Sequence, residues 1–129
     1  MSYTQYAEAF DRDGFVVVPS FLTGDDFAEL KRNLERYISD VVPSLSGTEA
    51  FYQNPNQPQT LKQFYRMERD SYFEAMMSQP RWIELAEALL GEPCEYHGGP
   101  AWFNKPPNTE HPTPPHQDNY YFKYHPPLA

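Results

Sequence analysis

The spacing of the apolar residues changes at Gly91, and this change limits the possible folds more than any other feature of the sequence. Before Gly91, apolar residues recur every three or four positions, as they do in amphipathic helices. After it, aromatic residues lie in short segments broken by glycine and proline, which is typical of strands. Helices followed by strands predict an α+β domain. We expect residues 1–92 to be mainly helical and residues 93–129 to supply the first strands of a sheet.

Local signals set the expected limits of the helices. The hydroxyl of Thr23 is suited to cap the N-terminus of a helix that Pro43 ends, and Asp25 and Asp26 lie where the helix dipole favours negative charge. Pro80 suits the first turn of a later helix, and Gly91 suits its end. The expected helices are residues 4–13, 23–42, 71–78 and 80–90, with Phe27, Leu30, Leu34, Tyr37, Ile38, Val41, Trp82, Ile83, Ala86, Leu89 and Leu90 facing inward.

Four segments read as strands. The β-branched run of residues 14–19, bounded by glycine and proline, predicts a buried strand. Residues 61–65, 95–105 and 116–124 are also expected to be extended. The intervening residues 43–60 and 106–115 are rich in proline and polar residues, and they predict loops.

Composition excludes several classes of function. The chain has 129 residues, which suits a single domain, and its 10 basic and 18 acidic residues give a net charge of −8. No Lys/Arg stripe is present, so we expect no binding to nucleic acid. No apolar run approaches the length of a membrane helix, so we expect no membrane partner. A single cysteine, Cys94, cannot form an internal disulfide, and together with the lack of a secretion signal this predicts a cytoplasmic protein.

His116 and Asp118 carry the clearest chemical signal in the sequence. Residues i and i+2 of a strand point to the same side, so an imidazole nitrogen and a carboxylate oxygen would converge on one point. These are two of the three protein ligands in the 2-His-1-carboxylate triad of non-haem Fe(II) oxygenases. By itself the His-x-Asp triplet also fits a solvated surface strand. The surrounding sequence is therefore needed to choose between a metal-ligand pair and such a strand.

Three segments carry a resemblance to the phytanoyl-CoA dioxygenase family of Fe(II)/2-oxoglutarate oxygenases. They are Gly14-Phe15-Val16-Val17-Val18-Pro19-Ser20-Phe21-Leu22-Thr23, Asn104-Lys105-Pro106-Pro107 and His116-Gln117-Asp118-Asn119-Tyr120-Tyr121-Phe122. Their order and spacing are similar to those of the N-terminal half of a family member. The resemblance therefore implies N-terminal helices packed on part of a double-stranded β-helix, a jelly-roll or cupin-like fold, left incomplete by this chain.

The resemblance also implies roles for individual residues. His116 and Asp118 would be the first two Fe(II) ligands, and Asn104 and Lys62 would contact the cosubstrate 2-oxoglutarate. The substrate would be a small organic molecule. Because related halogenases carry a small residue where Asp118 stands, the acidic ligand implies hydroxylation.

At its C-terminal end, this sequence differs from the members of the family. Family members continue with a distal histidine, which completes the triad, and an arginine, which pairs with 2-oxoglutarate, whereas this sequence ends 11 residues after Asp118. We therefore expect the isolated chain to be an inactive part of a dioxygenase, completed by a C-terminal half. The alternative is a non-catalytic binding or interaction module, a homodimer in which a second copy covers the open sheet edge.

Overall fold

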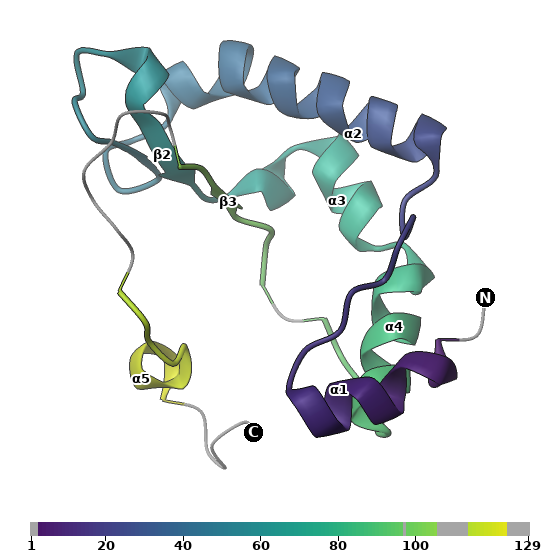
Figure 1. The fold of residues 1–129 in the computed structure, drawn as a ribbon. Helices are drawn as coiled ribbons and strands as arrows, with labels where there is room; N and C mark the ends of the chain where they lie inside the picture. Colours follow the sequence, from purple (N-terminus) through teal and green to yellow (C-terminus); the bar gives the residue numbers. More distant parts are fainter. Residues whose placement is uncertain (1–2, 97, 106–113, 124–129) are drawn as a thin grey trace.

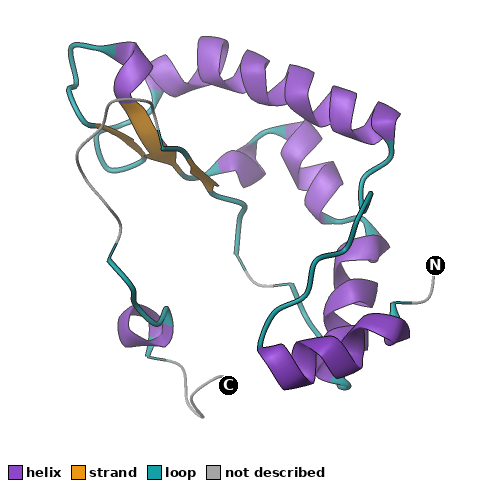
Figure 2. Ribbon diagram, viewed as in Figure 1, coloured by secondary structure: helices purple, strands orange, loops and turns teal. Residues whose placement is uncertain are grey.

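The computed structural model describes residues 3–96, 98–105 and 114–123, and within them it consists of helices around a small antiparallel sheet (Figures 1 and 2). The helices are α1 (Ala7–Asp13), α2 (Gly24–Arg36), α3 (Ser71–Met77), α4 (Pro80–Leu90) and α5 (Asn119–Phe122). The strands are β1 (Ala50–Tyr52), β2 (Leu61–Phe64) and β3 (Trp102–Phe103). The sheet order is β1-β2-β3, and both pairs of neighbours are antiparallel. This arrangement confirms an α+β fold, while a jelly roll is not established by the described strands.

The long helices begin and end at the residues that the sequence indicates. Thr23 Oγ1 accepts a hydrogen bond from the backbone N–H of Asp26 at 3.1 Å, and α2 begins one residue later. After Arg36 the helix continues as a π-helical turn, Tyr37–Val41, and Pro43 lies in the 3-10 turn that follows. Pro80 opens α4, and Gly91 closes it with a φ of 73°, a conformation that glycine adopts without steric cost.

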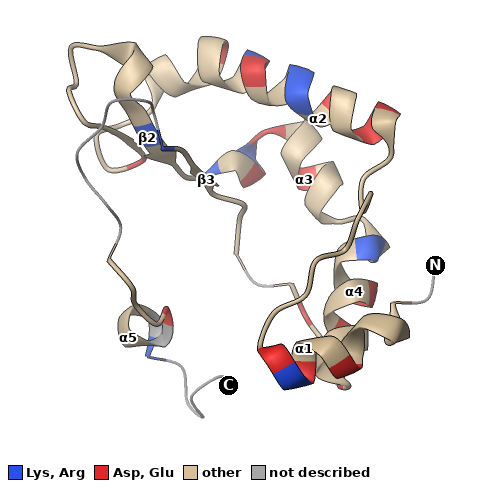
Figure 3. Cartoon of the chain, viewed as in Figure 1, with Lys and Arg blue, Asp and Glu red and all other residues tan. Residues whose placement is uncertain are grey.

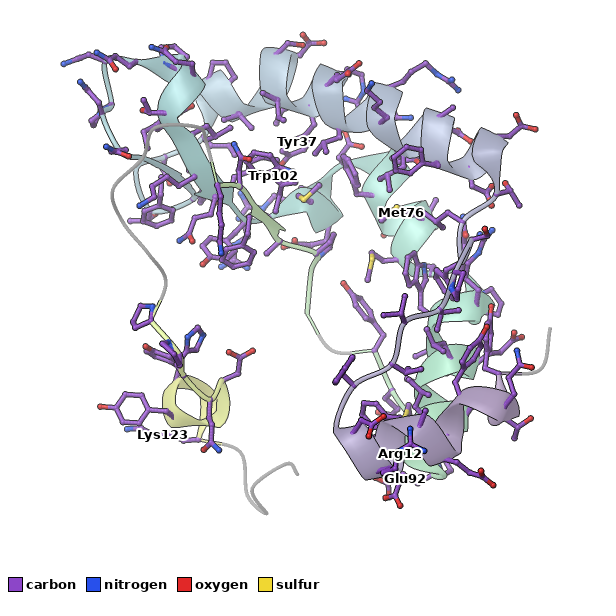
Figure 4. The ribbon with its side chains drawn as sticks, viewed as in Figure 1. Arg12, Tyr37, Met76, Glu92, Trp102 and Lys123 are labelled. Carbon is purple, nitrogen blue, oxygen red and sulfur yellow. The ribbon has the colours of Figure 1, made fainter. Side chains whose placement is uncertain are left out.

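Three fully buried aromatic rings form the centre of the core. The ring of Phe64 on β2 stacks on Tyr37 at a centroid distance of 5.4 Å and on Trp102 of β3 at 5.0 Å. Phe73 of α3 meets the Tyr37 ring edge-on at 5.5 Å. Figure 4 shows Tyr37 and Trp102 close together between α2 and the strands. The π-helical turn thus covers one face of the sheet, and α3 closes the core from the side.

Two ion pairs connect elements that lie far apart in the sequence. The Arg36 guanidinium at the end of α2 donates to both carboxylate oxygens of Asp70 at 2.8 Å, and Asp70 Oδ1 also accepts from Tyr72 N–H at the start of α3. Arg81 of α4 donates to Asp26 of α2 at 2.7 Å. Other charged residues are scattered over helices and strands and do not gather on one element (Figure 3). None of the described helices has the length and apolar character that a membrane crossing requires.

Two of the expected strands are wrong, and of a third, residues 95–105, only Trp102–Phe103 forms a strand within the described residues. Residues 15–18 form no strand, and Phe15 and Val17 are 66% and 72% exposed. No backbone–backbone hydrogen bond to these residues is formed within the described part of the chain, so the β-branched sequence lacks the neighbour that a strand requires. Of the expected strand 116–124, the described residues instead form a turn at Asp118 and the helix α5. A local turn, closed by the Tyr121 N–H to Asp118 carbonyl hydrogen bond of 2.9 Å, replaces cross-strand pairing there.

Two of the helix residues that were expected to face inward are exposed. Phe27 and Leu90 are 59% and 56% exposed, although both share the helical spacing of partly buried neighbours. They lie in the first turn of α2 and at the last residue of α4, where no described element covers them. Conversely, residues 43–60 are more than a loop, since they contain β1 and a 3-10 turn at Pro58–Thr60.

Acid is expected to destabilise the fold through Asp26 and Glu49. The hydrogen bond from Arg81 lowers the pKa of Asp26, and hydrogen bonds from Ser46 lower the pKa of Glu49. A depressed native pKa contributes stability that is present above the unfolded pKa and is lost as the pH falls through the native pKa. Because the ordinary values are 3.8 and 4.5, the loss should begin below about pH 4.5.

Urea denaturation between pH 3 and pH 7 tests this dependence. The variants Asp26→Asn and Glu49→Gln should each flatten the acid limb of the stability curve. Glu84→Gln is the matched control, because Glu84 is exposed in the middle of α4 and its side chain makes no hydrogen bond or ion pair with other described residues, and its replacement should leave the curve unchanged. If the unfolding free energy falls equally steeply with acid in both variants, other carboxylates cause its pH dependence.

Candidate functional site

His116 and Asp118 lie side by side in the structure. The imidazole Nε2 of His116 is 3.3 Å from Asp118 Oδ1, and the Asp118 side chain is 77% exposed. A turn brings the two groups together rather than strand alternation, because Asp118 directly precedes α5. An imidazole nitrogen and a carboxylate oxygen are therefore presented to solvent on one side of the segment.

The backbone and a neighbouring ring hold the imidazole in place. His116 Nδ1 lies 2.9 Å from the Pro114 carbonyl oxygen. Because a carbonyl can only accept, Nδ1 is the protonated donor in this contact, and the lone pair of a neutral ring is then on Nε2. The Tyr121 ring meets the imidazole edge-on at 5.7 Å. The nitrogen that faces Asp118 is thus the one available to a metal ion, an arrangement common among metal-binding histidines.

Lys62 and Asn104 are brought together by the pairing of β2 and β3. The Asn104 backbone N–H donates to the Lys62 carbonyl at 2.7 Å, and the Asn104 side-chain amide donates to the Leu61 carbonyl at 3.2 Å. A carboxamide has two N–H donors, so one remains. The Lys62 ammonium forms no ion pair with the described residues.

An irregularity in the sheet changes the direction of the Lys62 side chain. In the register of β1 with β2, Phe51 pairs with Gln63 and Tyr52 pairs with Leu61, which leaves Lys62 as the extra residue of a bulge. Leu61 and Phe64 consequently both face the core, although strict alternation would put them on opposite faces. Bulges occur often beside active sites, where they redirect a side chain.

The structure does not join these two pairs into one site. In Figure 1, α5, which directly follows Asp118, lies apart from the sheet and from α1 and α4. Within the described ranges no group of three or more His, Cys, Asp or Glu side chains could hold a metal ion. The described residues therefore contain two separate pairs of candidate site residues, His116 with Asp118 and Lys62 with Asn104.

Two residues beyond β2, Asp70 and Arg66, have structural roles that the sequence analysis did not predict. The Asp70 side chain is only 15% exposed and binds Arg36. The cap position of Asp70, directly before the helix-forming Ser71, is a signal that could have identified this role. Arg66 has a φ of 68°, which is uncommon for a residue other than glycine, and no sequence signal marks it.

Comparison with known proteins identifies the class of protein to which this domain and its His-x-Asp segment belong: the chain is related to dioxygenases. The model of the phytanoyl-CoA dioxygenase family (PhyH) matches residues 10–129, so the chain belongs to that family. It is also similar to the ectoine dioxygenase of Streptomyces coelicolor (strain ATCC BAA-471 / A3(2) / M145), with 27% identity over 90 residues. The match covers 70% of this chain but only 29% of that relative. No solved structure matches the chain.

Proposed function

We propose that this chain is the N-terminal part of a non-haem Fe(II)/2-oxoglutarate-dependent dioxygenase that hydroxylates a small organic substrate. Membership of the phytanoyl-CoA dioxygenase family supports the reaction class. The observation that carries the proposal is the convergence of His116 Nε2 and Asp118 Oδ1 in the His-x-Asp segment. The roles of Lys62 and Asn104 follow from the family resemblance and agree with their chemistry.

The donor atoms of His116 and Asp118 fit Fe(II). Imidazole nitrogen and carboxylate oxygen are the ligand types of the facial triad, which leaves other positions open for the cosubstrate and dioxygen. The exposed Asp118 carboxylate has no cation partner other than the neighbouring imidazole among the described residues. Bound Fe(II) would supply the redox chemistry that couples decarboxylation of 2-oxoglutarate to hydroxylation of the substrate. The chain's own contribution is to fix the histidine tautomer through Pro114 and to present the carboxylate beside it.

The pair on the sheet fits an anionic cosubstrate. The Lys62 ammonium, which has no ion-pair partner among the residues that the structure describes, supplies positive charge. The Asn104 amide supplies a directional donor held by its bond to Leu61. A dicarboxylate that meets both would have one end neutralised and oriented. This geometry favours recognition of a carboxylate over that of an uncharged ligand.

Replacement of Lys62 tests the cosubstrate proposal. Lys62→Met should weaken the binding of 2-oxoglutarate about tenfold or more, because a charge-assisted contact is lost. The measurement is an NMR titration of the chain with 2-oxoglutarate that follows the side-chain amide signals of Asn104. Asn104→Ala is a poorer probe, since it also removes the hydrogen bond to Leu61.

Lys31→Met is the matched control for this titration. Lys31 lies on the exposed surface of α2, 3.9 Å from Glu35, and its loss should leave the affinity unchanged. Equal affinity of the Lys62→Met variant and the unaltered chain would remove Lys62 from the proposed site. If Lys31→Met weakens the binding of 2-oxoglutarate as much as Lys62→Met does, the affinity depends only on the net charge of the chain.

The exposed face of the sheet favours a second candidate function, a dimeric interaction module. Phe51, Gln63 and Phe103 are neighbours across the three strands on the face opposite the core, and Phe103 is 67% exposed. Phe15 and Val17 expose further apolar surface. Sedimentation equilibrium separates the candidates, because the module would be a dimer that binds no 2-oxoglutarate.

A further inference from the structure

A pocket of about 410 Å³ lies where β2 ends, outside the residues assigned above. Its walls include Tyr65, Arg66 and Glu68, which follow β2, together with Thr48, Glu49 and Gly99. Pockets that bind small molecules commonly have volumes of this order, roughly 300–1,000 Å³. One aromatic ring, a hydroxyl and charges of both signs are thus available to a ligand.

Within the described part of the chain, Arg66 and Glu68 form only a loose ion pair, with each other. Arg66 Nη1 is 3.6 Å from Glu68 Oε1, which is beyond hydrogen-bond distance. Glu49, in contrast, is satisfied: its carboxylate accepts from the Ser46 hydroxyl at 2.9 Å and from Arg69 at 2.8 Å. The pocket therefore offers one cation and one anion, side by side and weakly engaged.

The surrounding contacts give these charged groups defined positions. The Arg66 carbonyl accepts from the Tyr37 hydroxyl at 3.4 Å and from the Arg69 N–H at 3.2 Å, which fixes the backbone that carries the guanidinium. The Glu68 carboxylate lies against Gly99, where a Cβ would overlap it. The negative charge of Glu68 also contributes to the raised pKa of Tyr96, after the larger effect of burial.

The wall beside these charges is aromatic. The Tyr65 hydroxyl accepts from the Gln63 amide at 3.2 Å, and its ring meets Phe51 and Phe103 edge-on at 6.0 and 6.2 Å. The apolar part of a ligand could pack on this ring while its charged groups meet Arg66 and Glu68. The exposed aromatic residues of the sheet thus continue into the pocket.

We infer that this pocket binds a zwitterionic small molecule of the amino-acid type, with its carboxylate on Arg66, its ammonium on Glu68 and its apolar part on Tyr65. An anion alone would face Glu68, and a cation alone would face Arg66, so either would meet a like charge. A zwitterion satisfies both groups at once.

This inference rests on the proposed function, since it names the substrate class of the proposed dioxygenase. Lys62 precedes Arg66 by four residues, so at roughly 3.3 Å per extended residue they lie at most about 13 Å apart. The pocket is therefore near enough to the proposed cosubstrate residues for both ligands to occupy the same sheet.

Three related probes test the charge requirement without metal or turnover. L-Phenylalanine carries both charges, N-acetyl-L-phenylalanine carries only the carboxylate, and L-phenylalaninamide carries only the ammonium. NMR titration of the chain should show at least about tenfold tighter binding of L-phenylalanine than of either single-charge probe. Shifts should concentrate at Tyr65, Arg66, Glu68 and Gly99. No binding of L-phenylalanine, or equal binding of all three probes, would overturn the inference.

The variants Arg66→Gln and Glu68→Gln assign each charge to its partner. Each should weaken L-phenylalanine binding at least about tenfold. Glu68→Gln should not further weaken the binding of N-acetyl-L-phenylalanine, because this probe lacks the ammonium that would contact Glu68. Arg66→Gln should likewise not further weaken the binding of L-phenylalaninamide, which lacks the carboxylate. Equal losses for every probe would contradict the assignment.

Arg12→Gln and Asp13→Asn serve as matched controls. These residues form an exposed ion pair of 2.7 Å on α1, away from the pocket, and their loss should leave binding unchanged. A parallel titration with 2-oxoglutarate separates the two proposals. If 2-oxoglutarate binds and L-phenylalanine does not, the inference about the pocket is refuted and the proposed cosubstrate site stands. If L-phenylalanine binds and 2-oxoglutarate does not, only the proposed cosubstrate site is refuted.

Discussion

Replacing Phe64 with alanine is expected to cost about 3–5 kcal/mol of unfolding free energy. The Phe64 side chain is fully buried, and its ring stacks on both Tyr37 and Trp102. Its loss would leave a cavity between the π-helical turn and the sheet and would remove two aromatic contacts at once. Because small domains are stable by only about 5–15 kcal/mol, this change should unfold a large fraction of the chain under mild denaturant.

Phe103→Ala provides the matched control for Phe64→Ala in equilibrium urea unfolding. Phe103 lies on the adjacent strand but on the uncovered face, with 67% of its surface exposed, and its removal should change stability by less than about 0.5 kcal/mol. A comparable cost at both positions would show that a second copy or another segment buries the outer face of the sheet. That result would favour the interaction module as the function of the chain.

The helices could be predicted from sequence because each depends on signals within a few residues. The Thr23 hydroxyl satisfies a backbone N–H three residues later, and Gly91 adopts the left-handed conformation that closes α4. Such interactions need no distant partner, so the sequence determines them locally. Phe27 and Leu90 were assigned wrongly for the opposite reason, since their exposure depends on what packs beside the helix ends.

The strands were predicted less well because pairing is not local. Residues 15–18 have strong β propensity but no paired neighbour, whereas Ala50–Tyr52 lies in a segment expected to be a loop and pairs with β2. Strand propensity depends largely on cross-strand packing, and sequence alone does not supply it. The bulge at Lys62 is likewise a property of the pair, since two strands are required to define it.

Some residues of the candidate site could likewise be predicted from sequence, and others required the fold. His116 and Asp118 could be proposed from their spacing together with the family resemblance of the surrounding segments, although the structure joins them through a turn and not through strand alternation. The contact of Asn104 with the strand of Lys62 spans more than forty residues and required the fold. The pocket charges Arg66 and Glu68 carry no motif, and only the folded chain shows that they line one pocket beside Gly99.

Replacing Asp118 with alanine is expected to abolish metal binding while leaving the fold intact. The carboxylate is one of two candidate metal donors, and its side chain is 77% exposed, so it contributes little to packing. Mn(II) added at low concentration should broaden the His116 ring signals of the unaltered chain and leave those of Asp118→Ala sharp. In the full-length parent, succinate production from 2-oxoglutarate should be lost, while the unfolding free energy should stay within about 0.5 kcal/mol.

Gln117→Ala is the control that separates ligation from local structure, because Gln117 is exposed, lies between the two proposed ligands and keeps its backbone hydrogen bond to Tyr120. It should retain Mn(II) broadening and turnover. If Asp118→Ala also retains normal succinate production, Asp118 is no ligand, and the short distance to His116 is a surface ion pair. If both variants lose metal binding together, the turn before α5 matters rather than the carboxylate, and the assignment of the second ligand would have to move to another residue.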